Sequence, residues 1–273
     1  MWRNVWIETK KVLLKVKEPE SLILINASIL LLLHHKYFRR GKIRRNILGE
    51  LGIKVTKGEI TELYSYAIWG ISSFFFYFVV PLILIKLLHR RRLTDFGVGF
   101  GDYKLGLKIF GLFLAVMLPL TILVGLLPDI CNAIGWAGGA KSLGTFSTFY
   151  PKVKWINPSL IGKADISTSA VIGRMLLVHL FLLIYFIGWE FIYRGYMLFG
   201  LYDRYGFAAI LIANIPFVVL HYSKPLPEAL GSVIAGIALC VLALKTRSFW
   251  PCAFLHWVIA ASMEMVVVFR SLI

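Results

Sequence analysis

Long apolar runs separated by short basic segments are the main pattern along this chain of 273 residues. A helix needs about 20 predominantly apolar residues to cross the roughly 30 Å hydrocarbon layer of a membrane. Three runs of more than 22 residues lie at residues 64–88, 105–127 and 171–199, and three runs shorter than these follow, at residues 208–221, 229–244 and 249–269. The pattern predicts an all-α fold, a polytopic bundle of transmembrane helices.

The first 63 residues are predicted to form a basic region with one short apolar helix. The apolar run at residues 22–33 has the length of a signal-peptide core or an interfacial helix, but no small-residue cleavage site follows it. We therefore expect a retained helix that is too short to count as a span. Residues 36–57 alternate basic and apolar positions, which fits a helix in the head-group plane and fits a solvated basic loop about equally well.

Two polar segments interrupt the apolar runs. Residues 96–102, FGVGFGD, superficially offer three glycines as a phosphate cradle, but they follow a membrane span and not a strand, so a flexible interfacial loop is favoured. Residues 128–170 are rich in Gly, Ser, Thr, Lys and Pro with interspersed aromatics. This composition predicts a loop at the membrane interface, long enough to act as a lid or to guide a substrate.

The composition excludes a soluble globular protein, since 59% of the residues are hydrophobic and only 16% are charged. A net charge of +16 would suit nucleic acid, but the basic residues flank the apolar runs, so anionic lipid head groups are the expected partner and nucleic acid is not. The three cysteines have no CxxC spacing. They indicate neither a disulfide framework nor a zinc finger.

Two opposite charges stand within the long apolar run of residues 171–199. Glu190 and Arg194 are four residues apart, so on a helix they share one face and can form an ion pair. An acid inside a membrane helix costs about 2.5–3.5 kcal/mol on insertion scales and usually faces a protein interior or a watery cavity. Glu190 is therefore the first candidate for a functional residue. Farther along, Gly231 and Gly236 are placed for close helix packing.

Together with His221 and His256, Glu190 and Arg194 make the chain resemble the CPBP family of intramembrane proteases, the CAAX-protease and bacteriocin-processing group. The family's motifs EExxxR, FxxxH and HxxxN are matched in order by Trp189, Glu190 and Arg194, by Phe217 and His221, and by His256 and Ala260. The resemblance covers about residues 171–265, which we expect to form the catalytic-type core within residues 171–273. It departs from the family pattern at Trp189, in place of the first Glu, and at Ala260, in place of the Asn.

The resemblance implies an intramembrane endopeptidase of the CAAX-protease type that cleaves a membrane-associated peptide or protein. Peptide hydrolysis requires a base that activates water and donors that hold the oxyanion. We expect Glu190 and His221 to activate the water, His256 to hold the oxyanion, and Arg194 to orient Glu190. Because Ala260 removes one donor, Tyr193 and Asn214 are candidate replacements.

Two alternatives come from the same residues. Trp189 and Ala260 favour a non-catalytic membrane scaffold or bacteriocin-immunity protein that keeps the fold. A transporter that relays protons through buried Glu and His predicts inverted repeats, which the sequence lacks.

The metal content and the location of the protein are also predicted. Glu190, His221 and His256 have the ligand types of a zinc site, but there is no HExxH and they lie on separate helices, so a site without metal or other cofactor is favoured. The protein is expected to be a multi-pass component of a bacterial plasma membrane.

Two further polar residues are assigned structural roles: His179 as a helix–helix hydrogen bonder and Glu264 as a partner across the bundle.

Overall fold

The computed structural model describes residues 18–39, 42–52, 59–126, 168–222 and 226–270, which form helices with no strand among them. The main helices are α2 (Pro19–His34), α3 (Lys42–Glu50), α4 (Glu59–Phe74), α5 (Val80–Leu84), α6 (Tyr103–Leu126), α9 (Thr168–Glu190), α10 (Leu198–Tyr205), α11 (Ala208–Val219), α12 (Leu226–Thr246) and α13 (Trp250–Arg270). The all-α prediction is confirmed. Residues 128–167 of the predicted loop lie outside the described residues, and its last three residues, 168–170, belong to the first turn of α9.

Within the described residues, five helical stretches are long and apolar enough to cross a membrane, namely Pro19–Phe38, Tyr66–His89, Tyr103–Ile122, Met175–Tyr205 and Ala229–Thr246. They match the runs expected from the sequence, with one correction at the N-terminal run. That helix begins before residue 22 and continues past residue 33, so it reaches a spanning length as well. The protein is an integral, multi-pass membrane protein.

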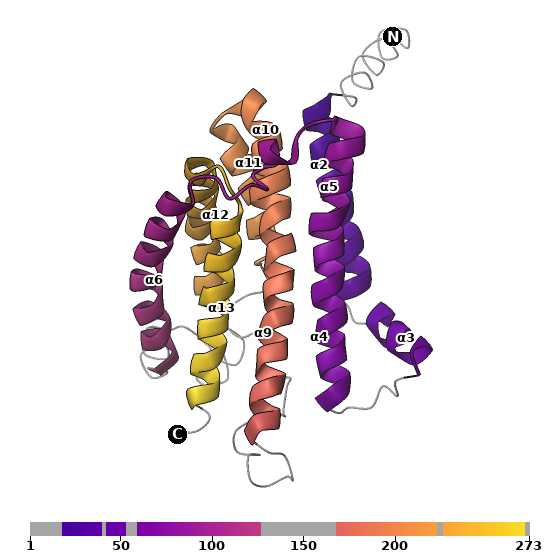
Figure 1. Cartoon of the computed structure of the whole chain (residues 1–273), viewed down its shortest axis with the longest axis vertical. Helices are drawn as coiled ribbons and strands as arrows, with labels where there is room; N and C mark the ends of the chain where they lie inside the picture. Colours follow the sequence, from indigo (N-terminus) through magenta and orange to yellow (C-terminus); the bar gives the residue numbers. More distant parts are fainter. Residues whose placement is uncertain (1–17, 40–41, 53–58, 127–167, 223–225, 271–273) are drawn as a thin grey trace.

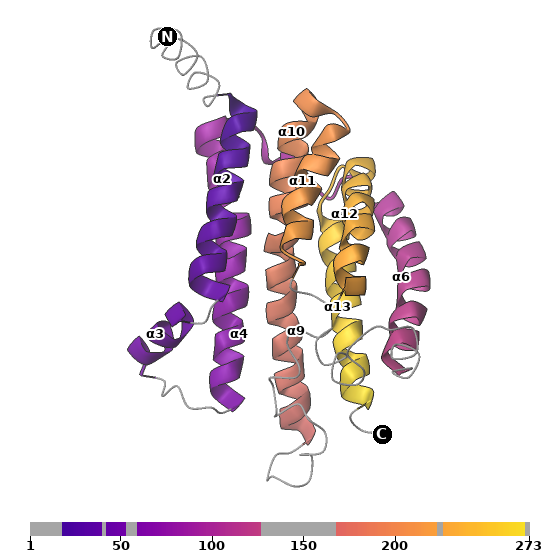
Figure 2. The ribbon, with the colours of Figure 1, turned by 180° about the vertical axis from the view of Figure 1, so that it is seen from behind.

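Helix α9 occupies the centre of the bundle. It packs against α4 on one side and α13 on the other, and α6 lies along the outer side of α13 (Figure 1). Helices α2, α11 and α12 cover the opposite face (Figure 2). Because α9 is surrounded by other helices and not by lipid alone, polar groups on its C-terminal half can be buried in protein.

Two glycines let α4 and α9 approach each other closely. A Cβ atom added at Gly188 of α9 would lie 2.9 Å from the carbonyl oxygen of Ser73, and one added at Gly70 of α4 would lie 2.6 Å from that of Phe181. Small residues commonly allow such backbone contact between membrane helices.

The two glycines predicted for α12 behave differently from each other. A Cβ at Gly236 would collide with the side-chain amide of Asn214 on α11, as expected for close packing, whereas one at Gly231 would meet nothing within 4 Å. The prediction is therefore right for Gly236 and wrong for Gly231.

A π-helical segment, Phe191–Met197, joins α9 to α10 without a break, directly after Glu190. Such wider turns are rare and often occur at functional sites. All seven of its residues are buried. The charged pair predicted from the sequence therefore lies where the helix changes its winding, deep in the bundle.

The glycine-containing segment at residues 96–102 runs from the end of the 3₁₀ helix Leu93–Phe96 to the start of α6, so it follows a helix and not a strand, as the sequence predicts. It is held against the turn between α12 and α13, because Phe249 donates its backbone N–H to the Gly97 carbonyl and the Trp250 indole donates to the Val98 carbonyl. Gly101 has a φ of +55° and lies against the backbone at Thr246, so a side chain would not fit there.

The basic segment after α2 contains the short helix α3, which agrees with the helical alternative at residues 36–57 and not with a loop throughout. It lies beside the lower part of α4 (Figure 1).

Candidate active site

Three of the four site residues predicted from the sequence are in direct contact. Glu190, the last residue of α9, pairs through Oε2 with Nη1 of Arg194 at 3.0 Å, and Oε1 accepts a hydrogen bond from Nδ1 of His256 on α13 at 2.5 Å. The expected Glu190–Arg194 pair is present. The contact with His256, 66 residues away, joins the first and third motifs of the resemblance.

Glu190 and Arg194 are completely covered by protein, each with 0% of its side chain exposed. Burying a charge is costly unless an opposite charge and hydrogen bonds compensate for it. Here the two charges compensate each other. The site therefore depends on both residues, and removing either one leaves the other without its ionic partner.

Arg194 has two further contacts that hold its guanidinium in place. Nη2 donates to the Gly236 carbonyl of α12 at 3.3 Å, and the guanidinium carbon lies 4.1 Å from the centroid of the Phe217 ring. A cation over an aromatic face is attracted by the ring's quadrupole, by about 2 kcal/mol or more when desolvated. Arg194 thus connects α9 with α11 and α12.

His221 is connected to Arg194 and His256 through the same aromatic ring, that of Phe217. Its own ring lies 4.5 Å from that of Phe217 on α11, and the His256 ring lies 6.1 Å from Phe217. His221 Nδ1 donates to the backbone carbonyl of Phe217 at 2.7 Å. The FxxxH motif identified Phe217 in the sequence. Its contacts with the Arg194 guanidinium and with both imidazoles depend on how the helices pack.

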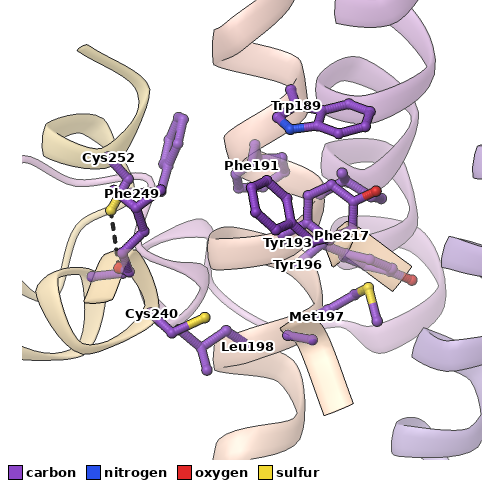
Figure 3. Packing of buried hydrophobic residues seen from close by; sticks show 14 of the residues in the cluster. Trp189, Phe191, Tyr193, Tyr196, Met197, Leu198, Phe217, Cys240, Phe249 and Cys252 are labelled. Atoms are coloured by element: carbon purple, nitrogen blue, oxygen red, sulfur yellow. Dashed lines mark hydrogen bonds between the residues drawn. The ribbon is translucent and has the colours of Figure 1, made fainter. Parts of the chain in front are cut away.

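Trp189, in the position of the family's first Glu, is directed into an aromatic cluster. Its ring lies 5.4 Å from Tyr185, 5.1 Å from Tyr193 and 6.3 Å from His221, and the side chain is almost fully buried. Figure 3 shows Trp189, Tyr193 and Phe217 close to one another. The space beside His221 is therefore filled by an indole.

The two candidate replacements for the missing Asn differ from each other. Asn214 donates through Nδ2 to the Val233 carbonyl of α12 at 3.1 Å, so its amide hydrogen is used to join helices. The Tyr193 hydroxyl is buried and has no hydrogen-bond partner among the described residues. Ala260, on α13, packs against the apolar core.

Among the residues that the structure describes, no three His, Cys, Asp or Glu side chains form a group with the arrangement of metal ligands. The backbone carbonyl of His179 accepts a hydrogen bond from the Trp257 indole at 3.0 Å, which joins α9 to α13. The side chain of Glu264 lies outside the described residues.

The fold and the site together define a polytopic membrane protein with an ionisable centre buried among its helices. Residues 172–262 match the family model described as type II CAAX prenyl endopeptidase Rce1-like, so the resemblance to CAAX proteases is confirmed over this part of the chain. No curated protein and no solved structure matches the chain. At the level of the family, the match supports an intramembrane endopeptidase.

Proposed function

We propose that the chain hydrolyses a peptide bond of a membrane-associated substrate, using water activated by a carboxylate–imidazole group. The observation that carries this proposal is the Glu190–His256 hydrogen bond at 2.5 Å, with Arg194 paired to the same carboxylate. An imidazole bonded to a buried carboxylate is a common means of moving protons in hydrolases. Glu190, His221, His256 and Arg194 make up the proposed site.

The proposed substrate is a peptide or protein held at the membrane, because Glu190 and Arg194 lie on a helical stretch of spanning length, Met175–Tyr205. The family description reads CAAX prenyl endopeptidase, which makes a prenylated CAAX peptide the first substrate to test. The basic segments that flank the spans suit anionic lipids around the protein. The proposal needs no metal, since the carboxylate and imidazoles supply the proton transfer.

The alternative is a non-catalytic scaffold of the same fold. It is favoured by Trp189, whose indole occupies the place of an acid and packs within 6.3 Å of the His221 ring, and by Ala260, which cannot donate a hydrogen bond. The two functions differ in what they require of His256. A scaffold should keep its function when His256 can no longer transfer a proton, and a peptidase should lose its activity.

The test is hydrolysis by the purified full chain in liposomes, with a prenylated CAAX peptide and the matched unprenylated peptide as substrates. His256→Ala is expected to lower kcat by about 10²–10⁴-fold. Phe254→Leu, on an exposed position of the same helix, is the matched control and should retain activity.

A comparison of membrane peptides in cells extends this test to substrates not chosen in advance. Cells with wild-type protein should contain cleavage products that cells with His256→Ala lack. Identical peptide profiles, together with full biological function of both His256→Ala and His221→Ala, would favour the scaffold.

A further inference from the structure

An arginine directly follows two of the spanning stretches: Arg90 follows Tyr66–His89, and Arg247 follows Ala229–Thr246. The two arginines lie at the same end of the bundle, because the chain that leaves Arg90 crosses this end on its way to α6 (Figure 1). On that path it reaches Gly101, where an added Cβ atom would lie 3.0 Å from the Arg247 carbonyl oxygen. Both arginines therefore stand where a spanning helix leaves the hydrocarbon, at the level of the lipid head groups.

Both arginines have a left-handed backbone, with φ of +52° at Arg90 and +53° at Arg247. Within the described residues, no other residue except glycine has a positive φ. This conformation brings Cβ close to the following carbonyl oxygen, so it strains an ordinary residue and favours glycine. Strained positions of this kind are retained where they serve a function, and here both are occupied by arginine.

Each arginine stands just beyond the end of a helix, where glycine is the commonest residue. Arg90 is the cap residue of the π-helical segment Ile85–His89. After Arg247, the Ser248 backbone N–H donates to the Ala243 carbonyl at 3.1 Å, the bond that closes a Schellman turn. A glycine would form either turn with less strain, so the turns themselves do not require a guanidinium group.

The helix dipole does not account for these two arginines. A cation in the last turn of a helix already interacts favourably with the carbonyls at its end. Lys245 has that position on α12, and Lys86 has it in the π-helical segment before Arg90, both without a positive φ. The reason for the guanidinium groups therefore lies outside the helices that they follow.

The side chains of both arginines are exposed, and neither forms an ion pair or a hydrogen bond with another described residue. The acids closest to them in the chain have other partners. Asp95 and Asp203 pair with Arg91 at 3.7 and 3.0 Å, and Asp102 accepts the Leu105 backbone N–H at the start of α6. Both guanidinium groups are thus available to an anion from outside the chain.

Two lysines extend the positive surface at Arg247. Asp102 donates its backbone N–H to the Thr246 carbonyl at 2.8 Å, which holds the start of α6 beside this arginine. Lys104 and Lys108 are exposed in the first two turns of α6, four residues apart and so on one face. This end of the bundle therefore carries several cations with no acid of the chain bound to them.

Exposed apolar side chains accompany the cations. Phe100 and Tyr103, on either side of the contact with Arg247, are 71% and 57% exposed, and Leu87, shortly before Arg90, is 74% exposed. A soluble anion covers none of this apolar surface. A phospholipid brings a phosphate group together with acyl chains that do cover it, and aromatic side chains are common at this depth of a membrane.

We propose that Arg90 and Arg247 bind the phosphate groups of anionic phospholipids, with Lys104 contributing beside Arg247. A guanidinium donates two parallel hydrogen bonds to a phosphate, which suits arginine better than lysine for the central position. The composition predicts anionic lipid around the chain in general, and the structure assigns two positions that select it. This inference does not depend on the proposed peptidase function.

The experiment uses the full chain in vesicles of mixed phosphatidylglycerol and phosphatidylcholine. The protein is extracted in mild detergent, and the enrichment of bound phosphatidylglycerol over phosphatidylcholine is measured by mass spectrometry. The variants are Arg90→Gly, Arg247→Gly, both together, and Arg247→Lys. The control is Arg204→Gln, which removes an exposed cation that already pairs with Glu18 at 3.4 Å.

Glycine separates the charge of each arginine from its backbone conformation. Because glycine adopts a positive φ without strain, each glycine variant should unfold in phosphatidylcholine alone at the wild-type temperature or above it. Each should lower the enrichment by about fivefold, and the double variant by about 25-fold, as expected for the loss of one and two cations at a membrane surface. Arg247→Lys and Arg204→Gln should keep it within about twofold, and the wild-type enrichment should fall as salt is added.

Full enrichment in the double glycine variant overturns the inference. So does an equal loss in Arg204→Gln, because the selection would then follow total charge and not these two positions. Displacement of the lipid by soluble glycerol phosphate overturns it in favour of a site for free phosphate. A glycine variant that unfolds well below wild type in phosphatidylcholine alone assigns its arginine a structural role instead. Enrichment that follows the expected order in a protein that cleaves no peptide supports this inference and counts against the proposed function alone.

Discussion

Loss of the Glu190 charge should destabilise the protein more than loss of the Arg194 charge. Both side chains are fully buried and pair at 3.0 Å. Breaking a buried pair from one side costs about 3–5 kcal/mol, against about 0–1 kcal/mol for a pair at the surface. The cost of Glu190→Gln should lie in the range of about 3–5 kcal/mol, because the guanidinium that remains cannot lose its proton.

Arg194→Met should cost less, since the carboxylate keeps its bond to His256 and can also take up a proton. The Met side chain retains the apolar contact with Phe217. The double variant Glu190→Gln/Arg194→Met should be more stable than Glu190→Gln, because replacing both members of a buried pair is often nearly neutral. The predicted order of unfolding free energy is therefore wild type and double variant highest, then Arg194→Met, then Glu190→Gln.

The assay is equilibrium unfolding of the four proteins in mixed detergent micelles, followed by helical content and analysed as a double-mutant cycle. The predicted coupling energy between the two positions is at least about 3 kcal/mol, because Glu190→Gln alone costs that much while the double variant costs little. A cost below about 1 kcal/mol for Glu190→Gln would refute the reasoning, because it would mean that water reaches the pair.

Three further predictions concern packing, metal and the altered motif. Gly188→Ala should lower the free energy of unfolding by about 1–3 kcal/mol, because the added methyl group overpacks α9 against Ser73. Gly173→Ala on the same helix is the control: its Cβ would meet no atom within 4 Å, so thermal unfolding should show an unchanged or higher stability. Activity should survive exhaustive chelation, and loss of activity that zinc restores would instead indicate a metalloprotease. Trp189→Glu recreates the family's paired acids but should lower the free energy of unfolding by about 3–5 kcal/mol, because it empties the space of a buried indole. Trp189→Phe should lower it less. A Trp189→Glu protein that is as stable as wild type and cleaves faster would contradict this prediction.

The membrane-spanning elements were predictable from sequence because they depend on local composition. In the hydrocarbon layer a helix satisfies its own backbone hydrogen bonds, so a long apolar run is enough to specify one. The spans at residues 64–88 and 105–127 and the long helix through Glu190 were identified in this way. The N-terminal helix was underestimated because its ends include Pro19 and the polar residues near His35, which a count of apolar positions leaves out.

The candidate site was predictable as a set of residues but not as an arrangement. The spacing of Glu190 and Arg194 is a local property of one helix, so their pairing followed from sequence. The contact between Glu190 and His256 depends on how α9 and α13 pack, and no pattern within either helix specifies it.

Tertiary packing alone decided the remaining features. It placed the Trp189 indole beside His221, set Phe217 between Arg194 and the imidazoles, and tied the glycines of residues 96–102 to the turn before α13. Each contact joins segments far apart in the chain, whose side chains complete their hydrogen bonds and close packing only when the helices assemble. The sequence by itself determined the candidate residues and the helices that carry them, and the packing of the bundle decided that Glu190 and Arg194 are fully buried while His256 is partly exposed.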